Sequence, residues 1–168
     1  MRIFMRNDDI TKYEDKVDVI VNTWNRNFLP RFMLNEAGVS KAIRKKSGDK
    51  PFQELKKAGF LKLGEAVITS SGFLNCKALI HVAGINACWK ATEDSVRQST
   101  YNALQLVIRQ KYKSIAMPII GSGTGGLKKE KCLALIKAEC KKFIRHEVDV
   151  YIIDFYPSLI LSSSNKCI

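Results

Sequence analysis

The sequence predicts an α/β protein, a three-layer α/β/α sandwich with a mixed, largely parallel central sheet. Four runs rich in β-branched and other apolar residues indicate strands buried on both faces: 17–21, 79–83, 115–120 and 148–153. Between them lie segments whose apolar residues recur every three or four positions, as on one face of a helix. Because strands and helices alternate, we expect helices on both faces of the sheet.

The first half of the chain supplies shorter elements. A helix is expected over residues 39–46, closed by Gly48, and a second over 52–58, ahead of Gly59. Glycine commonly follows the last turn of a helix because it adopts a left-handed backbone at no steric cost. Residues 66–70 indicate an additional strand.

The second half carries two longer helices. One holds the periodic apolar residues of 96–108, and Thr92 is a suitable N-cap for it. The other covers 132–144. We expect one domain over 1–161 and a frayed tail over 162–168, since 168 residues suffice for one sizeable core.

Composition limits the class of protein. Hydrophobic residues make up 46% and charged residues 26% of the chain, as in soluble globular proteins. No apolar run approaches the roughly 18 to 20 residues that span a bilayer, and the opening residues lack a signal-peptide pattern, so we expect a cytoplasmic protein without membrane association. The five cysteines show no C-x-x-C pair and indicate reduced thiols. The sequence suggests no metal site and no cofactor, and His81 is expected to be a hydrogen-bonded core residue.

The chain is strongly basic, with a formal net charge of +12. Such a charge attracts nucleic acid, anionic nucleotides or acidic lipid surfaces, or simply keeps a lysine-rich surface solvated. Charge alone does not choose among these interpretations.

In sheets of this kind, ligands collect beyond the carboxyl ends of the strands. Asp9 follows an opening strand, where a carboxylate either accepts the amino group of adenine or caps a turn. Asn22 and Asn25 end the first buried strand and suit either ribose hydroxyls or a turn. Phe155 lies near the end of the last strand, where an aromatic ring either stacks on a purine or completes the core.

Two glycine segments indicate a bound anion. Gly38 and Val39 open a helix, where free N–H groups and the helix dipole favour phosphate, although glycine also ends ordinary loops. The loop Gly121-Ser122-Gly123-Thr124-Gly125 follows a buried strand. So many glycines are costly to order, which favours close approach of backbone amides to an anion over a plain flexible turn. The loop matches neither the P-loop nor the G-x-G-x-x-G pattern.

Taken together, these segments resemble the macro domain family. The resemblance rests on DDIT, DVIVNTWN, GVSKAIRKKSG, LGEAVITSSGF, ALIHVAG and SIAMPIIGSGTGG, from about Asp8 to Phe155. It implies that Asp9, with Ile10 beside it, holds the adenine amino group and that Asn25 contacts the distal ribose. It further implies that Gly38 and Val39 form one diphosphate loop, residues 121–125 the other, and that Phe155 stacks on adenine.

Three departures from the family pattern bear on activity. Ser40 stands where hydrolases of the family carry an aspartate that orients or activates water, and serine is a poor base at neutral pH. Glu36 is the replacement carboxylate we consider, against its interpretation as a solvated loop charge. Trp24 replaces the usual alanine and precedes a longer apolar loop over 26–37, and Gly125 replaces a frequent tyrosine.

We expect a monomer, and the resemblance predicts that it binds ADP-ribose or ADP-ribosyl groups on proteins. Hydrolysis of the ADP-ribosyl linkage would then involve Asn25, Glu36 or Ser40. The alternatives are deacetylation of O-acetyl-ADP-ribose and a module that binds nucleic acid or poly-ADP-ribose through its basic surface without catalysis.

Overall fold

The computed structural model describes residues 1–25, 38–86 and 88–155. Eleven elements follow one another in these ranges: β1 (Arg2–Asp8), the 3-10 helix η1 (Ile10–Tyr13), β2 (Val19–Asn25), α1 (Gly38–Ser47), α2 (Lys50–Lys57), β3 (Ala66–Thr69), β4 (Ala78–Ile85), α3 (Glu93–Arg109), β5 (Ser114–Pro118), α4 (Lys129–Lys141) and β6 (Asp149–Phe155). The predicted tail over 162–168 lies outside the described residues.

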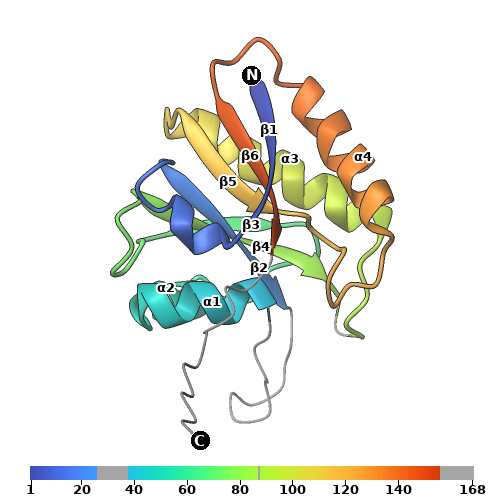
Figure 1. Cartoon of the computed structure of the whole chain (residues 1–168). Coiled ribbons are helices and arrows are strands. Elements are labelled where there is room, and N and C mark those ends of the chain that lie inside the picture. The colour runs from blue at the N-terminus through green and yellow to red at the C-terminus, as the bar shows by residue number, and fades with distance from the viewer. Residues whose placement is uncertain (26–37, 87, 156–168) are drawn as a thin grey trace, which may run out of the picture.

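The strands form one sheet in the order β1-β6-β5-β2-β4-β3 (Figure 1). All neighbours pair parallel except β3, which runs antiparallel to β4. The prediction of a mixed, largely parallel sheet is confirmed. Because five strands point the same way, their carboxyl ends lie along one edge of the sheet.

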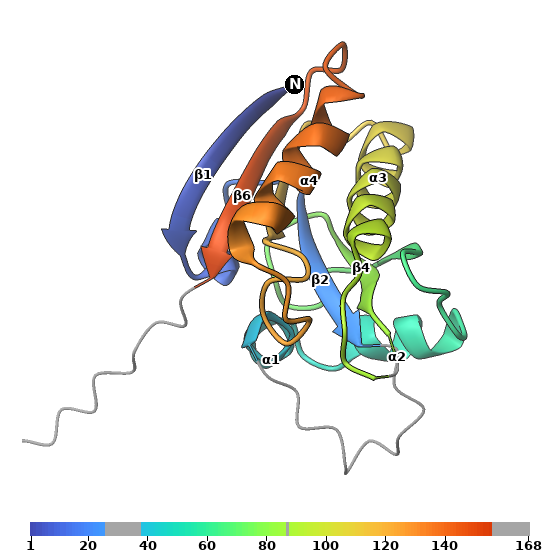
Figure 2. The ribbon, with the colours of Figure 1, turned by 90° about the vertical axis from the view of Figure 1, so that its right-hand side faces the viewer.

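Alternate residues of the central strands face two separate hydrophobic clusters, as the pleat requires. Val19 and Val21 of β2 pack with apolar residues of α3 and α4. Ile20 between them packs on the opposite face with Ile43 of α1 and Phe52 of α2. Figure 2 shows α3 and α4 together along one face of the sheet. The structure is therefore the three-layer sandwich that the sequence predicts.

Most element boundaries differ from the prediction by a few residues. Strand β2 continues to Asn25, beyond the β-branched run, because it pairs with β4 as far as Ile85, with a shift of register between Trp24 and Asn25. Helix α4 begins at Lys129 and ends at Lys141, so the apolar residues 143 and 144 fall in turns after it. Periodicity extends over these turns because Phe143 still reaches the core. Thr92 caps α3 as predicted, accepting a hydrogen bond from the Ser95 N–H.

The thiols are free in the described part of the chain, with Cys76, Cys132 and Cys140 buried and Cys88 exposed. Burial raises the pKa of the Cys76 and Cys140 thiols to about 11, so both stay protonated at neutral pH. They act as small apolar core residues, whereas Cys167 lies outside the described residues.

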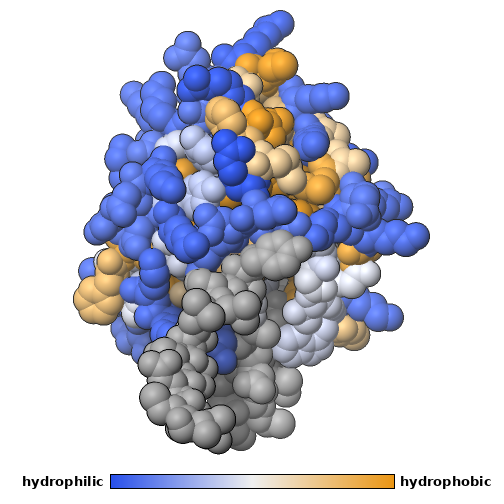
Figure 3. Space-filling view, viewed as in Figure 1, coloured by the Kyte–Doolittle hydropathy of each residue, from blue (hydrophilic) through white to orange (hydrophobic). Residues whose placement is uncertain are grey.

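Hydrophilic residues cover most of the described surface in Figure 3, with smaller apolar areas between them. None of the described helices is long and apolar enough to cross a bilayer. The same part of the chain holds no cluster of three or more His, Cys, Asp or Glu side chains placed to bind a metal ion.

Candidate functional site

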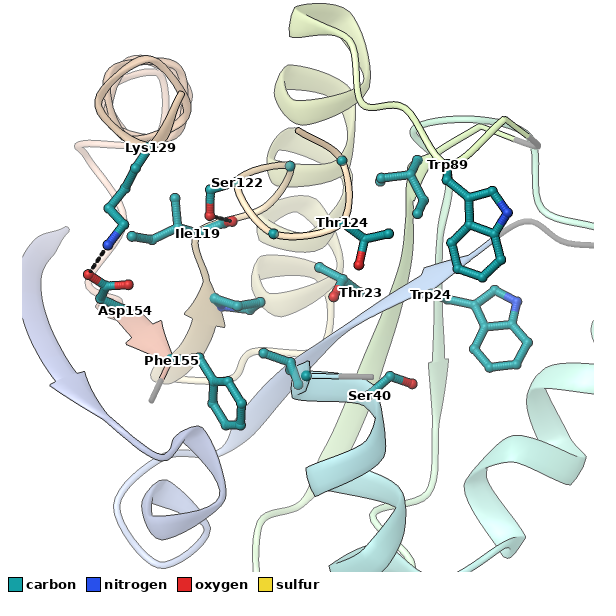
Figure 4. A pocket seen from close by; sticks show the side chains of 18 residues that line it. Thr23, Trp24, Ser40, Trp89, Ile119, Ser122, Thr124, Lys129, Asp154 and Phe155 are labelled. Atoms are coloured by element: carbon teal, nitrogen blue, oxygen red, sulfur yellow. Dashed lines mark hydrogen bonds and ion pairs between the residues drawn. The ribbon is translucent and has the colours of Figure 1, made fainter. Parts of the chain in front are cut away.

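A pocket of about 310 Å³ lies at the carboxyl edge of the sheet. Its walls come from the ends of four neighbouring strands, and Figure 4 shows the side chains that line it. Strand β6 contributes Asp154 and Phe155, β5 contributes Pro118, β2 contributes Thr23 and Trp24, and β4 contributes Gly84 and Ile85. The sheet order therefore places Phe155 at one end of the pocket and the ends of β2 and β4 at the other.

The start of α1 forms one wall, with Gly38, Val39 and Ser40 lining the pocket. Gly38 has a φ of +59°, and a Cβ there would meet no atom within 4 Å. Its glycine character is thus explained by the left-handed backbone rather than by crowding. The first N–H groups of an α-helix have no intrahelical acceptor and carry the positive end of the helix dipole, so this wall favours an anion.

The loop after β5 forms the opposite wall, and every residue from 121 to 125 lines the pocket. Its internal hydrogen bonds leave the middle of the loop open: Gly126 N–H donates to the Gly123 carbonyl and Leu127 N–H to the Gly121 carbonyl. The amides of Gly123, Thr124 and Gly125 donate to no other residue within the described ranges. Successive unpaired amides of this kind form a concave site for an anion.

The three glycines of this loop differ in what surrounds them. Gly121 has a φ of +89°, and a Cβ there would lie 2.7 Å from Cγ2 of Val96. A Cβ on Gly125 would lie 2.7 Å from Cβ of Ala91. Packing of the protein therefore requires glycine at both positions. Gly123 is different, because its φ lies outside the left-handed range and a Cβ there would meet nothing within 4 Å. No contact among the described residues explains why position 123 is glycine.

A charged pair lies at the β6 end of the pocket. Lys129 Nζ, at the first residue of α4, lies 2.7 Å from Asp154 Oδ2. Both residues line the pocket beside Phe155 (Figure 4). Phe155 also packs against the cluster that contains Ile10, so it is partly a core residue as well as a pocket residue. Stacking of its ring on a purine stays a prediction.

Asp9 and Ile10 do not line the pocket. Asp9 Oδ1 accepts hydrogen bonds from the Thr11 N–H at 2.9 Å and the Thr11 hydroxyl at 2.8 Å, so Asp9 caps η1. The turn-capping interpretation is confirmed. Asp9 nevertheless remains next to the site, since Asp8 pairs in register with Phe155.

Asn22 is placed differently from the prediction. Its side chain is fully buried and does not line the pocket, and Nδ2 lies 2.9 Å from Nδ1 of His81. Side chains alternate along a strand, so Asn22 lies on the face that Ile20 shares with α1 and α2. Thr23 and Trp24, nearer the carboxyl end of β2, line the pocket. The side chain therefore has a structural role in the folded chain, and its contact with a ribose stays a prediction.

His81 is the hydrogen-bonded core residue that the sequence predicts. Its Nε2 lies 2.9 Å from Thr69 Oγ1, and its ring meets Phe52 edge-on. Since Asn22 donates to Nδ1, Nε2 carries the proton and donates to Thr69. Burial lowers the pKa of His81 to about 3, so the ring is neutral at physiological pH. This neutral ring, hydrogen-bonded to Asn22 of β2 and Thr69 of β3, stabilises the sheet. It is unsuited to acid–base catalysis.

The predicted catalytic residues are only partly placed. Ser40 lines the pocket, but its Oγ is buried and has no hydrogen-bond partner within the described chain. The backbone of Asn25 ends β2, while Glu36 and the rest of the loop 26–37 lie outside the described residues, as does the side chain of Asn25.

Sequence reasoning missed several pocket residues, of which Trp89, Lys129 and Thr23 carry useful chemistry. Trp89 follows β4 by four residues, and its position after a strand's carboxyl end was the available signal. Lys129 begins a helix that the periodicity places three residues later, so nothing in the pattern pointed to it.

Comparison with known proteins identifies this arrangement. The family model described as "Macro domain" matches residues 21–136, which include the start of α1 and the loop over 121–125. The chain belongs to the macro domain family.

Relatives of this macro domain carry informative names. An O-acetyl-ADP-ribose deacetylase of Escherichia coli is 33% identical over 154 residues, which are 86% of this chain and 82% of that protein. Human protein mono-ADP-ribosyltransferase PARP14 is 34% identical over 137 residues, or 82% of this chain, but the chain spans only 7% of that protein. Among solved structures, the Oceanobacillus iheyensis macrodomain with ADP has a TM-score of 0.72 at 27% identity, covering 92% of this chain and 83% of that one.

Proposed function

We propose that this macro domain binds ADP-ribose, either free or attached to a protein. The observation that carries the proposal is that Gly38, at the start of α1, and Gly123, in the loop after β5, line one pocket. Two walls of backbone amides then face a single anion from opposite sides, which suits a diphosphate. The name of the solved relative with ADP agrees with a diphosphate nucleotide as ligand.

The order of the strands orients the nucleotide. Phe155 and the neighbouring turn at Asp9 lie at the β1–β6 end, where an aromatic face and a carboxylate suit adenine and its amino group. The diphosphate takes the middle, between α1 and the loop over 121–125. The distal ribose then reaches the ends of β2 and β4, where Asn25 is the proposed contact.

Hydrolysis of an ADP-ribosyl linkage is the finer part of the proposal. Ser40 takes the place of the family's aspartate, and serine is a poor base at neutral pH. Without that general base the rate falls by about 100- to 10,000-fold. Positioning by the two amide walls still contributes to rate, so we propose a binder with slow hydrolysis, for which Glu36 is the remaining candidate base.

The names of the deacetylase relatives favour a second candidate, removal of the acetyl group from O-acetyl-ADP-ribose. Both reactions require the same nucleotide site and differ only in the bond that water attacks. The net charge of +12 supports a third candidate, binding of nucleic acid or poly-ADP-ribose on the surface.

We further propose one domain over 1–161 that acts as a cytoplasmic monomer. The free thiols at Cys76, Cys88, Cys132 and Cys140 fit a reducing compartment.

The test is a calorimetric titration with ADP-ribose and with a single-stranded oligonucleotide, each at two salt concentrations. Binding in the pocket should weaken only slightly with salt, whereas binding to a nucleic-acid backbone should weaken steeply. Pyrophosphate alone should bind poorly. If ADP-ribose binds at neither salt concentration, the proposal is refuted. Incubation with ADP-ribosylated protein and with O-acetyl-ADP-ribose then separates the reactions by their products, ADP-ribose or acetate.

A further inference from the structure

Both tryptophans of the chain line the pocket, at the end farthest from the Lys129–Asp154 pair. Figure 4 shows the indoles of Trp24 and Trp89 at that end. Their elements explain the proximity, because β2 and β4 are paired neighbours and Trp24 stands in register with Ala83. Two large aromatic side chains at one end of a polar nucleotide pocket require an explanation beyond the diphosphate.

The backbone at Trp89 is strained. Its φ is +63°, a left-handed conformation that bulky side chains rarely adopt. The turn is held by Asn86, whose Oδ1 accepts hydrogen bonds from the N–H groups of Cys88 at 2.9 Å and Lys90 at 3.0 Å. A backbone bond from Trp89 N–H to the Asn86 carbonyl, 3.0 Å, closes it. Glycine or asparagine would adopt this backbone more readily, so a bulky indole stands here against its conformational preference.

Charge is distributed unevenly along the pocket. Among the described lining residues, the charged side chains are Lys129 and Asp154, which pair with each other at the β6 end. The tryptophan end presents indole faces and the hydroxyl-bearing residues Thr23 and Thr124. The face of an indole is electron-rich and attracts a cation placed over it.

We propose that Trp24 and Trp89 form a subsite for a planar, positively charged group attached to the anomeric carbon of the distal ribose. This inference rests on the proposed binding of ADP-ribose, since the nucleotide orients the group toward the ends of β2 and β4. Two ligands carry that chemistry: ADP-ribose linked to an arginine guanidinium, and a dinucleotide whose second base is a nicotinamidium ring. A neutral ester on the same carbon gains packing but no cation–π attraction.

Tryptophan fluorescence reports on this subsite directly, because the chain has no tryptophan elsewhere. ADP-ribose, ADP-ribosyl-arginine and NAD⁺ are titrated separately into the full chain, with calorimetry in parallel. At least one of the two cationic ligands should bind roughly tenfold more tightly than ADP-ribose and change the emission further. If only ADP-ribosyl-arginine binds more tightly than ADP-ribose, the cationic group comes from a modified protein. If only NAD⁺ binds more tightly, the cationic group comes from the free dinucleotide.

The matched variants are Trp89→Gly and Phe73→Ala. Glycine accepts the left-handed backbone at position 89 and removes the indole. Phe73 is 86% exposed and does not line the pocket, so it controls for loss of an aromatic side chain. Trp89→Gly should bind ADP-ribose and the cationic ligands with equal affinity, so that the tenfold preference is lost, and Phe73→Ala should keep the wild-type preference.

Two results separate this inference from the proposed function. If ADP-ribose binds but neither cationic ligand binds more tightly, or if Trp89→Gly keeps the preference, the subsite is refuted and the binding of ADP-ribose stands. If ADP-ribose itself fails to bind, the proposed function fails first and the subsite with it.

Discussion

Asp8, the last residue of β1, pairs in register with Phe155, the last residue of β6. The turn that begins at Asp9 therefore lies beside the aromatic side chain that borders the pocket. This pairing brings the start and the end of the described chain together at the end of the site where we place adenine.

Asp9 both caps η1 and is the proposed acceptor for the adenine amino group, and two substitutions separate these roles. Asp9→Asn keeps an oxygen for the Thr11 N–H, so its stability should match the wild type, whereas Asp9→Ala should cost about 1 kcal/mol. Both should lower the affinity for ADP-ribose at least about tenfold. Chemical unfolding and calorimetry on the three proteins check this, and an unchanged affinity in Asp9→Asn would remove Asp9 from the site.

Two alanine substitutions in the loop after β5 should have opposite consequences. Gly121→Ala places a Cβ against Val96 in a left-handed backbone and should cost about 2 kcal/mol or more in unfolding free energy. Gly123→Ala meets open space and should leave stability within about 0.5 kcal/mol while weakening ADP-ribose binding. Urea denaturation with parallel titration measures both effects. Similar stability losses in the two variants would contradict the account of the loop.

The buried, neutral His81 predicts a dependence of stability on pH. Its pKa is about 3 in the folded chain and about 6.5 in the unfolded chain, so only the unfolded state takes up the proton between these values. The contribution is fully present above pH 6.5 and is lost as the pH falls toward 3, with a slope of up to about 1.4 kcal/mol per pH unit.

Urea denaturation at several pH values from 6.5 down to 4.5 measures this slope. His81→Gln should flatten the profile even if it lowers stability throughout. His146→Gln, at the exposed second histidine, is the control and should keep the wild-type slope. An equal slope in wild type and His81→Gln would show that another group titrates.

The sequence predicted the fold class because the relevant patterns are local. β-branched runs and three-to-four spacing follow from burial of one strand or one helix face, and these alone indicated the parallel sheet between two helical layers. Boundaries were less predictable, because pairing with β4 extends β2 to Asn25 beyond its apolar run.

The site was predicted where backbone chemistry dominates and missed where tertiary packing decides. The glycine segments at Gly38 and Gly123 share one pocket, as two free-amide loops require. The side chain of Asn22 is buried against His81, a contact between residues 59 positions apart that no local pattern reveals. Trp89 and Lys129 approach the pocket only through the turns and helix starts that carry them, which no local pattern reveals.

The central claim is that amides from α1 and from the loop after β5 surround one diphosphate. Calorimetric titration of ADP-ribose into Gly123→Glu, beside Gln53→Glu as control, tests it most directly. Gln53 is exposed on α2 outside the pocket, so both variants add one negative charge to the chain. Gln53→Glu should bind like the wild type, and Gly123→Glu should show no binding, because its side chain and charge occupy the place of the diphosphate. Equal affinity in the two variants would contradict the account.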